Sequence, residues 1–236
     1  MENQAKINHQ TPPFGKQMLA DAVCRPILFS TPMVKAILDG RKTQTRRLFK
    51  VNKQTITADE ESVFFDVEIG EAVYNSIGGQ SWWQCPYGNV GDILWVRETF
   101  YEPLFEKLNG KYYYKADLEE QGWNFKWKPS LFMPKEACRL FLEITNIRCE
   151  RLQDITGDEA VKEGIMPLNM SSAQLAESGQ LYFDYSKPKQ FFNDGLPSFW
   201  SFNSLWCSIN GNKSWEENPF VWVIEFKRVD CPNGFH

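Results

Sequence analysis

The sequence predicts an α+β domain built on a small β-barrel, with flanking helices and long insertions. Candidate strands, seen as apolar runs or as alternating apolar and polar residues, recur from residue 25 to the end of the chain. Candidate helices interrupt them, which produces the order β-α-β…β-β-α-α-β. The 236 residues contain no internal repeat and no linker between two cores, so we expect one domain.

The first elements follow one another closely. Residues 25–29 (RPILF) form an apolar run that predicts a strand. A helix follows, with Thr31 as a good N-cap and Pro32 at the first helical position, where its missing N–H costs nothing. Gly40 predicts the end of this helix. The apolar face of the helix is formed by Val34, Ile37 and Leu38.

The middle of the chain has the patterns of β structure. Residues 52–80 carry weak strand patterns at most, whereas residues 93–100 and 111–117 each predict a strand. Residues 124–128 alternate apolar and basic side chains, which predicts an edge strand with one solvated face. Residues 139–152 alternate β-branched and apolar positions and form the clearest strand of the chain.

The last third begins with a capping box, since Thr156 is followed three residues later by Glu159. The short helix that this motif predicts ends at Gly164. Further on we expect a long excursion, an amphipathic aromatic helix and a closing strand, at 167–198, 199–209 and 218–229. We therefore expect a single domain over 25–229, with a mobile or surface-lying tail at 1–24 and a C-terminal tail at 230–236.

The composition excludes several classes of protein. No apolar run reaches the ~18 residues of a membrane span, and the N-terminus lacks the apolar core of a secretory signal, so we expect a cytoplasmic protein. The only histidines, His9 and His236, lie near the chain ends, which argues against a Ser-His-Asp site or a His-ligated metal. The cysteines form no C-x-x-C pair, and no P-loop or dinucleotide signature occurs. We expect neither a metal nor a cofactor.

The charge of the protein is unevenly distributed. The formal net charge is -4, which does not indicate a bulk electrostatic grip on nucleic acid. Residues 41–53 nevertheless hold six cations and no acid. This patch favours a focused anionic ligand, such as a nucleotide or a few phosphates, and its alternative is a solvated basic face. Aromatic residues make up 15% of the chain, and their abundance does not separate core residues from stacking platforms for bases.

The segment GRKTQTRR at residues 40–47 is the strongest candidate for chemistry. In an extended conformation Thr43 and Thr45 share one side and Lys42 faces the other. A threonine hydroxyl needs a base beside it to act as a nucleophile, and a lysine serves if burial and nearby cations lower its pKa. A phosphate-contacting turn or a plain surface loop is the alternative. The neighbouring cations are Arg41, Arg46 and Arg47.

Two further positions carry charge in an unusual place. Glu163 lies at the end of the short helix, where the helix dipole does not favour a carboxylate. Arg97 and Glu98 are adjacent in a predicted strand, so one of the two points inward. That geometry predicts either a buried ion pair or a contact with a ligand.

Four segments resemble the ASCH-domain family, and in particular its larger phage and prophage members. They are RPILFSTPMVKAILDGRKTQTRR, GDILWVRETF, LFLEITNIRCERLQDITGDEAVKEGI and NPFVWVIEFKRV, within residues 25–50, 88–102, 138–166 and 199–229. The resemblance implies a PUA-like β-barrel with flanking helices, and a cleft for RNA or a nucleoside lined by GRKTQTRR. The segments outside the common core would be insertions near 52–84, 103–135 and 167–198.

One small branch of this family hydrolyses the acetyl group from N4-acetylcytidine, and its lysine, threonine and glutamate match Lys42, Thr45 and Glu163. The resemblance implies a metal-independent amide hydrolysis, in which neutral Lys42 takes the proton of Thr45 and the hydroxyl attacks the acetyl carbonyl. Glu163 would orient Lys42, shuttle protons or hold the cytosine edge, and backbone amides or an arginine would stabilise the oxyanion. The candidate substrate-binding residues are Arg41, Thr43, Arg46, Arg47, Arg97 and Glu98.

Two other function classes stay open. A non-catalytic module that binds RNA or a modified base would suit the basic segment and the many aromatic residues. A phage accessory protein that acts through protein contacts would suit the large aromatic insertions. For the nucleic-acid-directed functions the expected partner is a nucleoside or a short single-stranded RNA. A monomer is favoured, and the sequence leaves the oligomeric state open.

Overall fold

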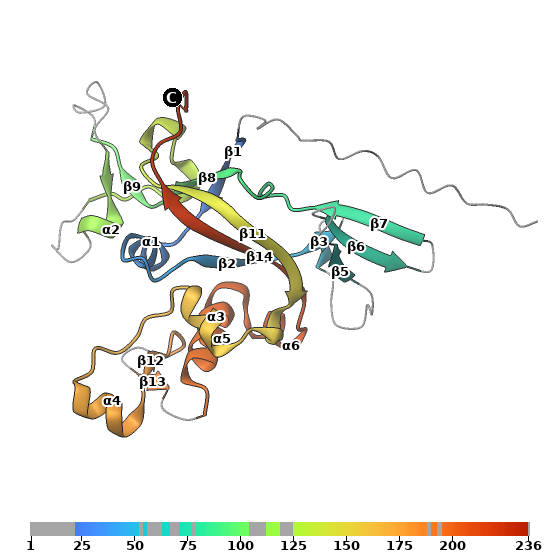
Figure 1. The fold of residues 1–236 in the computed structure, drawn as a ribbon. Coiled ribbons are helices and arrows are strands. Elements are labelled where there is room, and N and C mark those ends of the chain that lie inside the picture. Colours follow the sequence, from blue (N-terminus) through green and yellow to red (C-terminus); the bar gives the residue numbers. More distant parts are fainter. Residues whose placement is uncertain are drawn as a thin grey trace, which may run out of the picture.

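The fold is mixed α+β and is built around one open five-stranded sheet (Figure 1). The computed structural model describes residues 22–51, 54–55, 63–66, 71–76, 79–103, 112–118, 125–187, 190–192 and 195–235. Most of the predicted N-terminal tail therefore lies outside the described residues. Within them, no helix is both long and apolar enough to cross a membrane.

The central sheet has the strand order β1-β8-β11-β14-β2. Its members are β1 (Cys24–Leu28), β8 (Ile93–Arg97), β11 (Phe141–Arg151), β14 (Phe220–Val229) and β2 (Gln44–Leu48). The first pair, β1 with β8, is parallel and the other pairs are antiparallel. The strands predicted at 25–29, 139–152 and 218–229 are thus confirmed, and the basic segment supplies the edge strand β2.

The sheet is open rather than closed into a barrel, since among the described strands β1 and β2 stand at its two edges and do not pair with each other. The ends of these edge strands nevertheless approach each other. The guanidinium of Arg47 in β2 donates a hydrogen bond to the carbonyl of Leu28 at the end of β1, over 2.8 Å. The two edge strands are therefore connected by the Arg47 side chain and not by backbone hydrogen bonds.

Helix α1 (Thr31–Leu38) connects the two edge strands. Ser30 occupies its N-cap, one residue earlier than predicted, and makes no side-chain capping bond. Val34 and Ile37 are buried in the main core, as their spacing predicted. Gly40 follows the C-cap with a φ of 75°, a conformation that glycine adopts without the strain a side chain would add.

Three helices group beneath one end of the sheet: α3 (Gly157–Lys162), α5 (Pro197–Asn210) and α6 (Asn212–Glu216) (Figure 1). The capping box that predicted α3 is present, since the Thr156 hydroxyl accepts from the Glu159 N–H and the Glu159 carboxylate accepts from the Thr156 N–H. Gly164 ends this segment with a φ of 86°. Aromatic residues of α5 are buried, as its amphipathic pattern predicted.

Two predicted strands are largely replaced by other structure. Of the residues predicted as a strand at 111–117, the structure describes 112–117; among these only Tyr113–Tyr114 form a strand, β10, paired with β9 (Phe100–Tyr101), and α2 (Lys115–Leu118) follows at once. Tertiary contacts select this helix, because Ala116 is buried and Asp117 forms an ion pair with Arg139. Of the edge strand predicted over 124–128, the described residues 125–128 form one bridge, between Lys128 and Phe100. Short 3-10 turns follow at Ser130–Phe132, Lys135–Ala137 and Leu152–Asp154.

The predicted insertions carry small sheets of their own. In the first, the weak strand patterns fall on β5 (Val63–Asp66) and β6 (Glu71–Ser76), which form a three-stranded sheet with β7 (Gly79–Gln84). The pair β3 (Lys50–Val51) and β4 (Gln54–Thr55), which was not predicted, lies where this insertion begins. The three-stranded sheet projects to one side of the central sheet (Figure 1). The excursion at 167–198 contains α4 (Ser172–Ser178) and the pair β12 (Tyr182–Phe183) and β13 (Phe191–Phe192).

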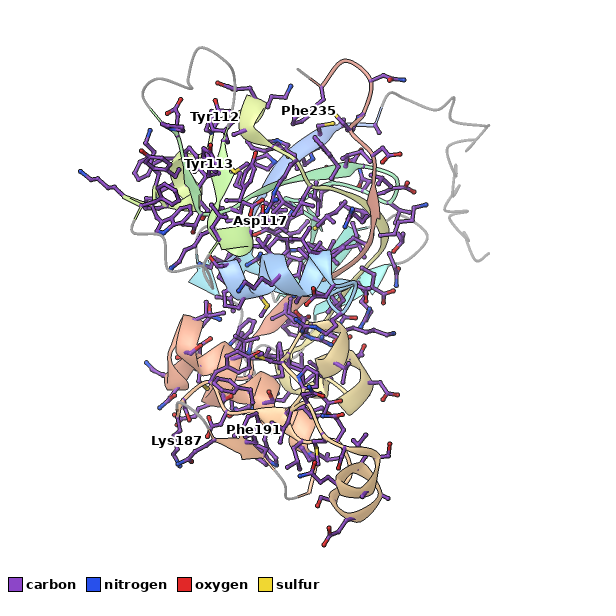
Figure 2. All side chains as sticks on the ribbon, turned by 90° about the vertical axis from the view of Figure 1, so that its left-hand side faces the viewer. Tyr112, Tyr113, Asp117, Lys187, Phe191 and Phe235 are labelled. Atoms are coloured by element: carbon purple, nitrogen blue, oxygen red, sulfur yellow. The ribbon has the colours of Figure 1, made fainter. Side chains whose placement is uncertain are left out.

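The hydrophobic core has two parts. The larger part lies between the sheet and its helices, and Trp222 and Phe202 belong to it. The smaller part surrounds Phe100 and Phe141 and includes Phe235, which contacts Phe141 with ring centroids 4.7 Å apart. The segment predicted as a C-terminal tail therefore contributes a buried aromatic ring. Figure 2 shows Phe235 at one end of the molecule and Lys187 and Phe191 at the other.

Candidate functional site

A cavity of about 870 Å³ lies at the free edge of β2, where the central sheet does not close. Its walls come from the ends of β1 and α1, from β2, from the end of β7 and from α5. Its polar side chains include Lys42, Thr45, Arg46, Arg47, Lys50 and Glu163, and its aromatic side chains include Phe29, Phe49, Trp83, Tyr87, Trp206 and Trp222. A mostly apolar wall with a few convergent polar groups is typical of a small-molecule site.

The alternation of β2 sorts the residues of the basic segment onto two faces. Gln44 and Arg46 contact Glu163 on the α3 side, and Lys42, two residues before Gln44, contacts it as well. Thr45 and Arg47 therefore project from the other face of the strand. Because β2 is an edge strand, the cavity beside it reaches residues of both faces.

The ammonium group of Lys42 is buried and uses all three of its N–H donors. Its Nζ atom donates to the carbonyl of Gln44 at 2.8 Å, to the carbonyl of Glu163 at 2.7 Å and to Oε2 of Glu163 at 3.1 Å. Burial lowers the pKa of Lys42 below its ordinary value, and this outweighs the opposing effect of the Glu163 carboxylate. The lysine is thus held as a paired cation beside the group that can take its proton.

Glu163 is positioned by the end of α3, where it is the C-cap residue. Its carboxylate lies between Lys42 and Nη1 of Arg46, which donates to it at 3.1 Å. The chain can pass this close to Lys42 because the next residue is Gly164: a Cβ atom there would lie 2.7 Å from Cβ of Lys42. The unusual place of a carboxylate at a helix C-terminus is therefore compensated by two cations.

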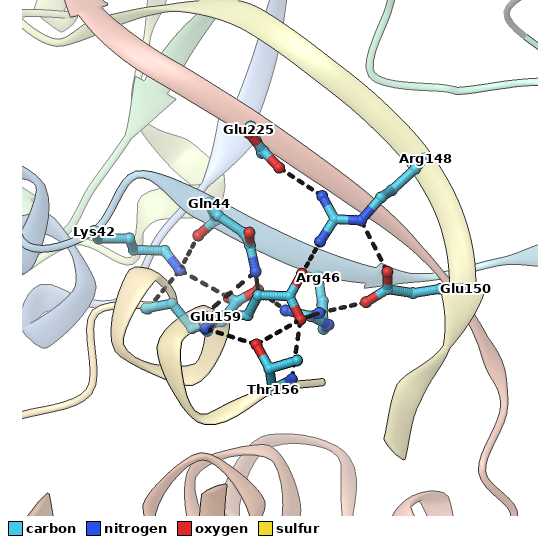
Figure 3. A network of polar contacts seen from close by, with 9 residues as sticks. Lys42, Gln44, Arg46, Arg148, Glu150, Thr156, Glu159 and Glu225 are labelled. Carbon is cyan, nitrogen blue, oxygen red and sulfur yellow. Dashed lines mark hydrogen bonds and ion pairs between the residues drawn. The ribbon is translucent and has the colours of Figure 1, made fainter. Parts of the chain in front are cut away.

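Arg46 is the centre of a larger ionic network, which Figure 3 shows. Its side chain is fully buried and contacts the carboxylates of Glu150, Glu159 and Glu163. Arg148 extends the network by pairing with Glu150, Glu159 and Glu225. Burial tends to raise the pKa of Glu159, but the Thr156 N–H and the charges of Arg46 and Arg148 hold it below its ordinary value. The network binds α3 to β2 and β11.

Thr45 lines the same cavity as Lys42 and Glu163, and only 3% of its surface is exposed. Its hydroxyl makes no hydrogen bond with any residue that the structure describes. Lys42 and Thr45 therefore line one cavity, and no hydrogen bond among the described residues joins them, whereas Lys42 and Glu163 are hydrogen-bonded. Two members of the predicted trio thus form a pair, and the third lines the same cavity.

The other predicted binding residues divide into two groups. Arg46 and Arg47 line the cavity, and the rest are not among its lining residues. Arg41 donates to the carbonyls of Gly164 and Ile165 and pairs with Asp39. Thr43 is exposed, and its N–H donates to the carbonyl of Lys162. These contacts hold the segment against α3.

Arg97 and Glu98 do not line the cavity, although the carbonyl of Arg97 accepts from the N–H of Phe29, which does. Glu98 is 1% exposed and forms a buried ion pair, with Arg139 and not with Arg97, at 2.8 Å. Burial raises the pKa of Glu98 in spite of this arginine. Arg97 lies over the Trp95 ring and donates to the carbonyl of Leu131. Of the two predicted roles, the geometry fits the buried ion pair.

Several cavity and network residues were not singled out from the sequence. Gln44 lies inside the basic segment, and its position two residues from Lys42 and from Arg46 was a usable signal. Glu159 carried a local signal only as the capping residue of α3, and Glu150 and the aromatic walls carried none, since the contacts that bring them to the site join distant parts of the chain. Among the described residues, no cluster of three or more histidine, cysteine or acidic side chains could hold a metal ion.

No protein-family model, curated protein or solved structure significantly matches the chain.

Proposed function

We propose that this protein is a nucleoside- or RNA-directed ASCH domain that removes the acyl group from N4-acetylcytidine or a related modified nucleoside. The observation that carries the proposal is the convergence of Lys42, Thr45 and Glu163 on one cavity with aromatic walls. Such walls suit a planar base, because bases stack on aromatic side chains. The cavity of about 870 Å³ has the size of a typical small-molecule site.

The proposed reaction starts with a proton transfer from Lys42 Nζ to Glu163 Oε2, which lie 3.1 Å apart. The neutral amine then takes the proton of Thr45, and the oxygen attacks the acyl carbon. The bond from carbon to N4 breaks, Lys42 returns the proton to N4, and water hydrolyses the acyl-threonine. Burial favours the first step because it lowers the pKa of Lys42.

This mechanism requires Lys42 to exchange one of its three present acceptors for Thr45. Bound substrate supplies a reason for the exchange, because it excludes water and adds a new polar partner to the cavity. A PUA-like barrel fits the same proposal, since the curled sheet is tied at its open edges by Arg47 and the cavity occupies the opening.

The test is incubation with N4-acetylcytidine and chromatographic detection of cytidine. We expect Thr45→Val, which removes the hydroxyl and keeps the shape, to lower turnover at least about 100-fold. Thr43→Val is the matched control, because Thr43 is exposed and lies outside the cavity. Lack of cytidine release above the level of Lys42→Ala would exclude this substrate, and full activity of Thr45→Val would exclude Thr45 as nucleophile.

A second candidate, binding of a modified base without chemistry, is favoured by the hydrogen bonding of Lys42. All three of its donors are engaged, and no hydrogen bond among the described residues joins it to Thr45. This function predicts calorimetric binding of N4-acetylcytidine by the wild type and by Thr45→Val alike, with no cytidine released by either. Release of cytidine by the wild type would exclude it.

A further inference from the structure

The cations that line the cavity fall into two groups. Lys42 and Arg46 are matched by the carboxylates of the network around Glu163. Arg47 and Lys50 line the same cavity, and neither has a carboxylate within 4.0 Å among the described residues. Within the described part of the chain, these two positive charges therefore line the cavity without an ion-pair partner. Unmatched cations in a concave site attract an anionic ligand group.

Buried N–H donors without partners lie in the same walls. Nε of Arg47 and Nε1 of Trp83 are both buried and make no hydrogen bond, and both residues line the cavity. An unpaired buried donor is unfavourable unless a ligand or water supplies the acceptor. The remaining contacts of Arg47 hold it in place, since it donates to the carbonyl of Leu28 at 2.8 Å and its Cζ atom lies 5.2 Å from the centre of the Phe29 ring.

We infer that the part of the cavity lined by Arg47, Lys50 and the indole N–H of Trp83 is a phosphate subsite. The ligand would then be a nucleotide or a nucleotide unit of single-stranded RNA, and not a free nucleoside. Arginine suits this task because its guanidinium presents several N–H donors to phosphate oxygens, and lysine adds a mobile point charge at the exposed rim. The inference rests on the proposed function, because it takes the base to occupy the aromatic part of the cavity.

A phosphate subsite would also explain why Arg47 and Lys50, at and just beyond the end of the edge strand β2, have no carboxylate partner among the described residues. Burial lowers the pKa of Arg47, because desolvation disfavours its charge. A bound phosphate would relieve that cost and would leave the Lys42–Glu163 pair free to face the base. The paired cations would thus face the base, and Arg47 and Lys50 the phosphate, of one nucleotide.

The experiment measures dissociation constants for N4-acetylcytidine, for its 5′-monophosphate and for a short single-stranded RNA with one N4-acetylcytidine. We expect the phosphate to tighten binding about tenfold at low salt, and the gain to shrink as sodium chloride is added. Lys50→Glu should abolish the gain, and because Lys50 is exposed this variant keeps the fold. Arg47→Gln should reduce the gain as well. Lys187→Ala, an exposed lysine outside the cavity, is the control that keeps it.

The outcomes separate this inference from the proposed function. Equal affinity for the nucleoside and both phosphorylated ligands, or a gain that survives in Lys50→Glu and Arg47→Gln, overturns the phosphate subsite and leaves the nucleoside site standing. Absence of binding to all three ligands overturns the proposed function and the subsite together. A gain seen only with RNA assigns the subsite to a phosphodiester, and a gain with the monophosphate assigns it to a free nucleotide; either result supports the subsite.

Discussion

Gly164 and Lys42 touch so closely that only a hydrogen atom fits between the end of α3 and the lysine of the cavity. A Cβ atom at position 164 would lie 2.7 Å from Cβ of Lys42 and 2.9 Å from Cβ of Ala36. Both distances are far below van der Waals contact. The position of Glu163, and with it the buried ion pair, therefore depends on the absence of one methyl group.

We expect Gly164→Ala to lower the free energy of unfolding by about 3 kcal/mol, because strain at a positive φ adds to overpacking against Lys42. Gly179→Ala is the control: its φ is also positive, at 69°, but nothing lies within 4 Å of the added Cβ. We expect Gly179→Ala to lower the free energy of unfolding by only about 1 kcal/mol. Urea denaturation measures both, and equal losses would contradict the close packing at Lys42.

Lys42→Met should destabilise the protein by about 3 kcal/mol, because it leaves two backbone carbonyls and one carboxylate oxygen without their donor. The double variant with Glu163→Gln should lose less than the sum of the single variants, since the two side chains interact directly. Lys213→Met, on a side chain that is 86% exposed, should change little. Chemical denaturation of the wild type, the two single variants and the double variant gives the coupling free energy between Lys42 and Glu163. Additive losses of stability would contradict a direct interaction between the two side chains.

Glu159→Gln should cost about 2 kcal/mol at neutral pH, because the charge that pairs with Arg46 and Arg148 is lost while an oxygen for the Thr156 N–H remains. The pKa of Glu159 is lowered in the folded state, so its contribution is present above its ordinary value of 4.5 and is lost as the pH falls through the folded value. The melting temperatures of wild type and variant should therefore converge in acid. A difference that does not depend on pH would contradict this, and the exposed Glu177→Gln serves as control.

Glu98→Ala should lower stability by about 3 kcal/mol and leave the dissociation constant for N4-acetylcytidine unchanged. The variant removes the buried partner of Arg139, whereas Glu98 does not line the cavity. Thermal denaturation and calorimetric titration of the same sample measure the two quantities. If Glu98→Ala bound N4-acetylcytidine more weakly but were as stable as the wild type, Glu98 would be a ligand-contacting residue and not a structural one.

The elements that could be predicted are those specified within a few residues. The capping box of Thr156 and Glu159 spans four residues, the strand at 139–152 carries its own alternation, and the strand at 218–229 contains a continuous apolar run. The helix α2 could not be predicted, because the same tyrosine-rich segment favours a strand and only the burial of Ala116 and its neighbour's ion pair select the helix. The sequence could not predict that the sheet stays open either, because this depends on whether the edge strands β1 and β2 pair with each other in space.

The residues of the candidate site could be named from the sequence, whereas their arrangement in space could not. The resemblance to one family named Lys42, Thr45 and Glu163, and all three line the cavity. Local alternation placed Lys42 and Thr45 on opposite faces of a strand, which is consistent with the contacts, but it could not show that an edge strand exposes both faces to one cavity. Arg97 and Glu98 carried a similar local signal, yet they do not line the cavity: Glu98 pairs with Arg139, and Arg97 lies over the Trp95 ring.

By itself the sequence determined the α+β class, the main strands and helices and the residue types of the candidate site, because these follow from periodicity, caps and local motifs. Only the tertiary structure decided which charges are neutralised and which remain unmatched. The Lys42–Glu163 pair joins residues 121 positions apart, while Arg47 and Lys50, from the same basic segment, find no carboxylate among the described residues. Electrostatic pairing depends on the distance between charges in space. Local sequence patterns do not specify which distant residues the fold brings within that distance.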